Sequence, residues 1–140
     1  MKIEGNGEPR TRNPSDPMNE TIPSEKKQVY LVDLDGTLAY YERWGEKGEI
    51  GEPIPLMKKR VIEWINEGIE IRIFTARAFD INQVKSIKKW LMLNGFPPLE
   101  ITNVKGIDVD YLFDNIAREV INNTGIIVDR IGDLSKGNKL

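Results

Sequence analysis

The chain has 140 residues, with 20 basic and 22 acidic side chains, a formal net charge of −2, and neither cysteine nor histidine. This length suits a single domain with a sizeable core, and the near-neutral charge gives no overall field that would demand nucleic acid or an anionic membrane as partner. The missing residue types exclude disulfides, thiolate zinc sites, imidazole bases and His-ligated metals, so acid–base chemistry must rest on carboxylates, lysines or tyrosines. Because no secretory leader and no apolar run of membrane-spanning length occurs, we expect a cytoplasmic protein without a membrane partner.

The first part of the chain differs from the rest in composition. Residues 1–27 carry four of the eight prolines among polar residues and contain few apolar side chains that could anchor a packed element. We therefore predict a flexible N-terminal tail over residues 1–27 and one core domain over residues 28–140.

From Gln28 onward, strand-like and helix-like segments alternate. An apolar run at 29–32 predicts the first strand, and residues 38–52 are long enough for a small hairpin flap. A helix is predicted for 55–67, because apolar residues recur there at helical spacing between Pro55 and Gly68. Residues 69–74, which alternate isoleucine with charged residues, predict the second strand.

The second half of the chain continues the alternation. Asp80 is placed to cap a helix that ends at Asn94-Gly95, and 99–102 predicts a third strand. Further segments predict a strand at 110–114, a helix at 115–123 and a strand at 126–128. The expected fold is α/β: a Rossmann-like, doubly wound parallel sheet of about five strands with helices on both faces, a small flap and no cap domain.

Two aspartates follow the first strand in the motif Asp33-Leu34-Asp35-Gly36-Thr37. Like charges this close raise each other's pKa or recruit a cation, and Mg²⁺ suits one or two carboxylates plus a substrate phosphate. An EF-hand loop is excluded, because Leu38 and Trp44 stand where that loop requires Gly and Glu. A plain Asp-Gly surface turn remains an alternative.

Polar residues follow four of the predicted strands. Asp33, Thr75, Lys105 and Asp114 each lie at or just after the carboxyl end of one strand. Ligands of open α/β sheets bind at these ends, so we expect the four side chains to converge on one crevice.

These residues resemble the ordered signature of the haloacid dehalogenase-like hydrolase superfamily. The signature consists of Asp-x-Asp-Gly-Thr, a Ser or Thr, a Lys and one or two Asp, each at a strand end, and here it extends over roughly residues 28–128. The resemblance implies a magnesium-dependent phosphomonoester hydrolase that forms an aspartyl-phosphate. It makes Asp33 the nucleophile and Asp35 the general acid and base.

The resemblance also implies roles for the other strand-end residues. Thr75 would hydrogen-bond a phosphoryl oxygen, Lys105 would offset negative charge, and Mg²⁺ would be held by Asp33, Asp114 and the backbone carbonyl of Asp35. Many relatives have two adjacent aspartates where this chain has Asp114-Asn115. We therefore expect weaker metal binding rather than none.

Other residues are expected to contact the substrate. Arg77 is placed to reach a substrate phosphate, and Trp44, in the aromatic flap, could stack on a nucleobase. The alternatives are a solvated arginine and an aromatic residue that packs against the domain. We also expect three further residues to line the substrate site, namely Gly36, Thr37 and Ala76.

Two further functional hypotheses remain open. Within the hydrolase class, the chain is similar to the phosphatase part of bacteriophage-type polynucleotide kinases and to small capless members from bacteria and phages, which suggests a polynucleotide or nucleotide 3′- or 5′-phosphatase. From another class, a non-catalytic phosphate- or metal-binding module is conceivable, with Asn115 as its supporting feature. The expected partner is a phosphorylated substrate, either a small molecule or a nucleic-acid end, and nothing in the sequence indicates an oligomer.

Overall fold

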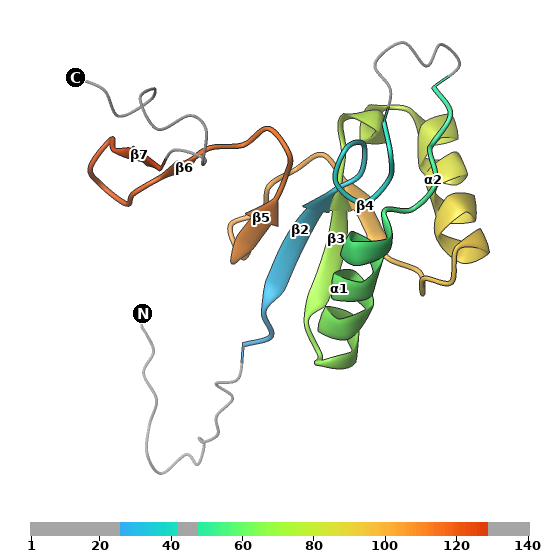
Figure 1. Ribbon diagram of the computed structural model, residues 1–140, viewed down its shortest axis with the longest axis horizontal. Coiled ribbons are helices and arrows are strands. Elements are labelled where there is room, and N and C mark those ends of the chain that lie inside the picture. The colour runs from blue at the N-terminus through green and yellow to red at the C-terminus, as the bar shows by residue number, and fades with distance from the viewer. Residues whose placement is uncertain (1–25, 42–47, 129–140) are drawn as a thin grey trace.

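The computed structural model describes residues 26–41 and 48–128 (Figure 1). Of the tail predicted for residues 1–27, only residues 26 and 27 lie within these ranges. Trp44 lies outside them. Within them, no helix is long and apolar enough to cross a membrane.

A parallel sheet lies at the centre of the fold. Tyr30 pairs in register with Ile71 on one side and with Tyr111 on the other. The strand order is β4-β3-β2-β5, so the chain moves outward in one direction over three strands and then returns to the opposite side of β2. The α/β class and the parallel sheet are confirmed. Its four strands are β2 (Val29–Asp33), β3 (Glu70–Phe74), β4 (Glu100–Thr102) and β5 (Tyr111–Phe113).

A helix connects β2 to β3, and another helix connects β3 to β4. α1 (Pro55–Asn66) has proline at its first turn, and α2 (Ile81–Leu93) is capped by Asp80, whose Oδ1 accepts from the Asn82 N–H at 2.9 Å. A short 3₁₀ helix, η1 (Ala76–Phe79), precedes α2. These elements match the predicted helices to within one or two residues.

The core lies between the sheet and these two helices. Ile71 and Ile73 of the sheet belong to one buried cluster with Val61 of α1 and Ile87 of α2. Both helices therefore cover the same face, as right-handed crossovers that step in one direction require.

On the opposite face of the sheet, a residue from the loop between β4 and β5 contacts the strands. Leu31 is fully buried but lies outside the main cluster, and its register partner Arg72 binds Asp108 through two hydrogen bonds of 3.1 and 2.7 Å. The ion pair between Arg72 and Asp108 therefore lies on this face. The two α-helices of the described residues, α1 and α2, both cover the other face. The predicted doubly wound sheet of five strands with helices on both faces is not confirmed.

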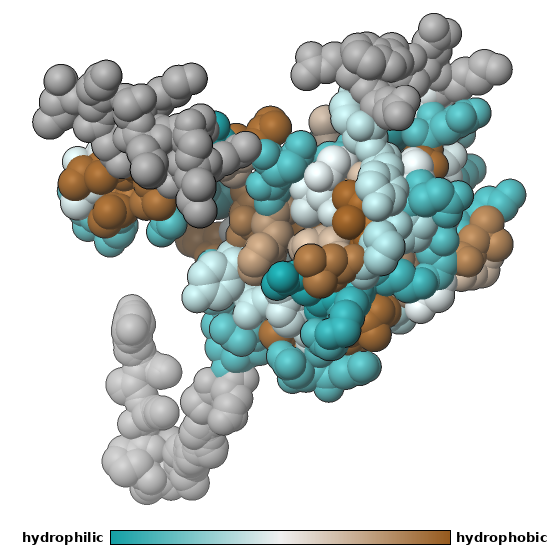
Figure 2. All heavy atoms as spheres, viewed as in Figure 1, coloured by the Kyte–Doolittle hydropathy of each residue, from teal (hydrophilic) through white to brown (hydrophobic). Residues whose placement is uncertain are grey.

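The segment after β5 corrects two sequence predictions. Residues 115–123 do not form the predicted helix; β6 (Glu119–Val120) and β7 (Ile127–Val128) instead make a separate antiparallel hairpin. The predicted strand at 126–128 therefore exists but does not join the parallel sheet. The turn contains Asn123 and Gly125 at positive φ, which favours a hairpin over a continued helix. Apolar side chains remain exposed on this hairpin, at the left of Figure 2.

The described ends of the predicted flap run side by side. The Tyr40 N–H donates to the Glu52 carbonyl at 2.9 Å, and the Ile54 N–H donates to the Leu38 carbonyl at 2.8 Å. A Cβ at Gly51 would lie 2.2 Å from the Tyr40 carbonyl oxygen, so this close approach requires glycine. The flap tip, residues 42–47, lies outside the described ranges.

Candidate active site

The strand order brings Asp33 and Asp114 to neighbouring positions. Asp33 ends β2 and Asp114 follows β5, the strand on the far side of β2 from β3 and β4. This is the topological switch point of the sheet, where open α/β folds form their binding crevice. The predicted convergence of these two carboxylates is therefore supported by the sheet topology.

The surroundings of Asp33 disfavour its charged form. Burial is the largest cause and the negative charge of Asp114 is the second, and together they raise the pKa of Asp33 to about 6. The Thr37 hydroxyl opposes this rise by donating to Asp33 Oδ2 at 3.2 Å. The ionised Asp33 carboxylate is therefore stabilised when it binds a proton or a cation.

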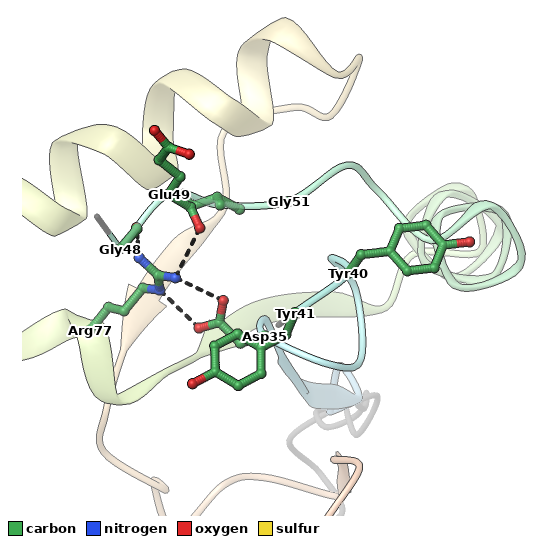
Figure 3. A pocket seen from close by; sticks show the side chains of 8 residues that line it. Asp35, Tyr40, Tyr41, Gly48, Glu49, Gly51 and Arg77 are labelled. Carbon is green, nitrogen blue, oxygen red and sulfur yellow. Dashed lines mark hydrogen bonds and ion pairs between the residues drawn. The ribbon is translucent and has the colours of Figure 1, made fainter. Parts of the chain in front are cut away.

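Asp35 makes different contacts. Its Oδ2 accepts from Arg77 Nε at 2.8 Å and its Oδ1 accepts from Arg77 Nη2 at 2.9 Å, which is a bidentate ion pair (Figure 3). The side chains are only 21% and 13% exposed, respectively, so the pair is well shielded from water. Both carboxylate oxygens of Asp35 are thus committed to the guanidinium group.

Arg77 also joins the flap to α2. Nη1 donates to the Gly48 carbonyl and, at 3.0 Å, to Gln83 Oε1, while Nη2 lies 3.5 Å from the Glu49 carbonyl. The pKa of Arg77 is raised, chiefly because it donates hydrogen bonds to Asp35. Arg77 is therefore a partly buried cation, paired with Asp35 at the side of the crevice, rather than a solvated surface residue.

Thr75 follows directly after the carboxyl end of β3. It is 4% exposed, and its Oγ1 accepts from the Arg77 N–H at 3.1 Å, which caps η1. Ala76 follows as the first, exposed residue of η1. Lys105 is exposed in the loop after β4, and it is not among the charges that shift the pKa of Asp33.

The loop after Asp33 packs against Asn115. Gly36 has a φ of 87°, and a Cβ there would lie 2.6 Å from Asn115 Nδ2. Thr37 Oγ1 lies 3.4 Å from Asn115 Oδ1 as well as 3.2 Å from Asp33, so its single proton can serve either acceptor. Asn115 therefore contacts the motif loop directly.

The sequence predicts that Asp33, Asp114 and the backbone carbonyl of Asp35 hold a magnesium ion. Within residues 26–41 and 48–128, no group of three or more acidic side chains is arranged as a metal cluster. Mg²⁺ needs only one or two carboxylates, with water and phosphate as its other ligands, and Asp33 with Asp114 meets that requirement. The Asp35 carboxylate faces Arg77, and the metal ligand predicted for Asp35 is its backbone carbonyl.

Two cavities flank these residues. One of about 500 Å³ lies between Asp35, Arg77, the two tyrosines Tyr40 and Tyr41, and the flap segment 48–51 (Figure 3). The other, of about 400 Å³, is lined by Thr37, Phe113 and Asp114 together with apolar residues of α1. The first contains charged and aromatic groups, and the second adjoins the proposed metal ligands.

The sequence did not predict the ion pair between Asp35 and Arg77 or the part played by Gln83. Opposite charges just beyond two adjacent strand ends were the available signal for the pair, but nothing in the sequence indicated that the flap carbonyls would orient Arg77. No known family model, curated protein or solved structure matches this chain.

Proposed function

We propose that this chain is a cytoplasmic, magnesium-dependent phosphomonoester hydrolase of the haloacid dehalogenase-like kind, with Asp33 as nucleophile. The observation that carries the proposal is the half-buried Asp33 carboxylate at the switch point of a parallel sheet, next to the second carboxylate Asp114. Both groups lie where an α/β sheet binds anionic ligands.

The proposed reaction has two displacements at phosphorus. An Asp33 oxygen bonds to phosphorus while the bond to the leaving oxygen breaks, and the leaving oxygen takes a proton from Asp35. Water then attacks the aspartyl-phosphate, gives its proton to Asp35, and releases inorganic phosphate and the Asp33 carboxylate. Asp35 must separate from Arg77 to take part, because both its oxygens are occupied in this structure.

The remaining groups would stabilise charge. Mg²⁺ bound by Asp33 and Asp114 would screen the repulsion between two anions and stabilise the charge that develops on the phosphoryl oxygens. Thr75 would donate its hydroxyl proton to a phosphoryl oxygen, since its Oγ1 already accepts from Arg77. Lys105 would have to move toward the crevice from its exposed loop.

A polynucleotide or nucleotide phosphatase is the finer form of this proposal. Tyr40 and Tyr41 are 56% and 54% exposed and line the cavity that contains Asp35 and Arg77. The Tyr41 ring lies near the Arg77 cation, and such a pair suits a substrate with a planar base and a phosphate. A non-catalytic phosphate- or metal-binding module is favoured by Asn115, where many relatives have a second aspartate, and by the occupied state of Asp35.

The test is phosphate release from a panel of sugar phosphates, nucleotides and 3′-phosphorylated oligonucleotides in Mg²⁺. The Asp33→Asn variant is expected to lose release by at least about 1,000-fold, because no nucleophile replaces the carboxylate. Asp108→Asn serves as the matched control, since Asp108 is an exposed carboxylate bound to Arg72. Equal release by wild type and Asp33→Asn would refute the proposed nucleophile, and silence across the panel would favour a binding role.

A further inference from the structure

The guanidinium group of Arg77 lines the cavity beside Asp35, and the Arg77 side chain is only 13% exposed. Its lining includes Asp35, Tyr41 and the flap segment 48–51, but neither Asp33 nor Asp114. In Figure 3 the guanidinium lies between the flap and Asp35, with the Tyr41 ring nearby and Tyr40 pointing away. Arg77 thus stands at the side of the crevice, apart from the carboxylates where the phosphoryl group would react.

The proposed reaction assigns this cavity to the leaving group. Asp35 acts on the leaving oxygen, and Asp35 lines this cavity and not the apolar one beside Asp114. The part of the substrate beyond that oxygen therefore extends toward Arg77. This step rests on the proposed function.

We propose that Arg77 selects phosphomonoesters whose leaving group carries a second oxyanion, which takes the place of the Asp35 carboxylate on the guanidinium group. Asp35 already shows how this edge of Arg77 holds an anion, with hydrogen bonds of 2.8 and 2.9 Å to its two oxygens. The same planar fork binds phosphate and carboxylate oxygens. Exchange of one bidentate anion for another preserves the number of charge-assisted hydrogen bonds at Arg77.

The other contacts of Arg77 keep the guanidinium in place during such an exchange. Nη1 is bound to the Gly48 carbonyl and to Gln83 Oε1, and these acceptors belong to the flap and to α2. Only the edge formed by Nε and Nη2 faces Asp35. The second oxyanion would occupy that edge and leave the two Asp35 oxygens free beside the leaving oxygen, where the proposed reaction needs them.

The experiment compares three substrates that share a three-carbon chain. Propane-1,3-diol bisphosphate carries the second oxyanion, propyl phosphate lacks it, and the monophosphate of 3-hydroxypropanoate separates a carboxylate from a phosphate. For the wild type we expect kcat/KM to be about 10- to 100-fold higher for the bisphosphate, the range typical of hydrogen bonds to charged groups. Release is counted only where Asp33→Asn abolishes it.

Variants of Arg77 then test whether the preference for the bisphosphate depends on this residue. Arg77→Met keeps the length of the side chain without its charge, and the ratio of kcat/KM for the bisphosphate to kcat/KM for propyl phosphate is expected to fall to about 1. Arg77→Lys keeps the charge without the fork and is expected to retain part of the preference. Arg72→Met is the matched control, because it breaks a bidentate pair with Asp108 on the other face of the sheet.

Two kinetic outcomes would overturn the proposal. A preference that persists in Arg77→Met with both kcat/KM values unchanged would show that the second oxyanion binds elsewhere. An equal loss for both substrates would show that Arg77 serves the reacting phosphoryl group or the fold alone.

A binding measurement separates this proposal from the proposed function. Dissociation constants of the bisphosphate and of propyl phosphate are measured by calorimetry in Mg²⁺ on Asp33→Asn, with and without Arg77→Met. A difference between the two ligands that requires Arg77 supports the oxyanion site even if no substrate is turned over, which would refute the proposed function alone. Equal differences in both proteins would refute the oxyanion site.

Discussion

Asp33 is expected to destabilise the fold when it is ionised and no metal is present. Burial and the charge of Asp114 raise its pKa from 3.8 to about 6, so folding disfavours the carboxylate form. Such a rise corresponds to about 3 kcal/mol at full effect, and since the group is only half-buried, solvent screening reduces this to about 1 to 1.5 kcal/mol. Asp33→Asn, which has a similar shape and carries no charge, should therefore stabilise the protein by that amount.

The sign of the effect fixes its pH dependence. Between pH 3.8 and about 6 the folded state binds more protons at Asp33 than the unfolded chain does, so the stability that this residue contributes falls as pH rises through that window. The advantage of Asp33→Asn should be complete above about pH 7 and should disappear toward pH 4. For a domain between about 100 and 150 residues long, 1 kcal/mol corresponds to an increase in Tm of about 4 °C.

The assay is urea and thermal unfolding of both proteins in EDTA at several pH values, followed by Mg²⁺ titration at pH 7.5. Mg²⁺ should stabilise the wild type more than Asp33→Asn, because it binds the folded carboxylates. Asp110→Asn provides a control of opposite sign: the Val29 N–H and Lys26 hold the pKa of Asp110 below its usual range, so its removal should destabilise the protein at neutral pH. A Tm advantage of Asp33→Asn that is independent of pH would refute the electrostatic account.

Three further outcomes are expected. Asp114→Asn should lower the pKa of Asp33, measured by carboxyl carbon NMR, and weaken Mg²⁺ binding by about tenfold in calorimetry; an unchanged pKa would contradict the coupling of the two carboxylates. Gly36→Ala should cost about 1 to 3 kcal/mol in urea unfolding because of its positive φ and its contact with Asn115, and adding Asn115→Ala should restore only the contact part. Trp64→Ala should cost about 3 kcal/mol, because its ring stacks on Phe113 with centroids 4.7 Å apart; a loss below about 1 kcal/mol would refute that packing role.

The outcome at residues 115–128 shows where sequence periodicity was insufficient. The apolar residues there fit a helix as well as a hairpin, and sequence periodicity alone did not settle which face they would bury. The turn around Asn123 and Gly125 decides the conformation, and the resulting hairpin leaves Val120 exposed. By contrast, α1 and α2 were predicted correctly, because their apolar stripes agreed with their start signals, which are Pro55 for α1 and the Asp80 cap for α2.

By itself the sequence determined the central strands, the two helices between them and the position of Asp33 and Asp35 at the end of the first strand. These features depend on local patterns of apolar spacing and turn residues, which each segment carries within its own sequence. Only the tertiary structure decided that Asp33 faces Asp114 while Asp35 faces Arg77. Those pairings join residues more than 40 positions apart, so they follow from strand order and from how the flap and η1 pack, which no local pattern encodes.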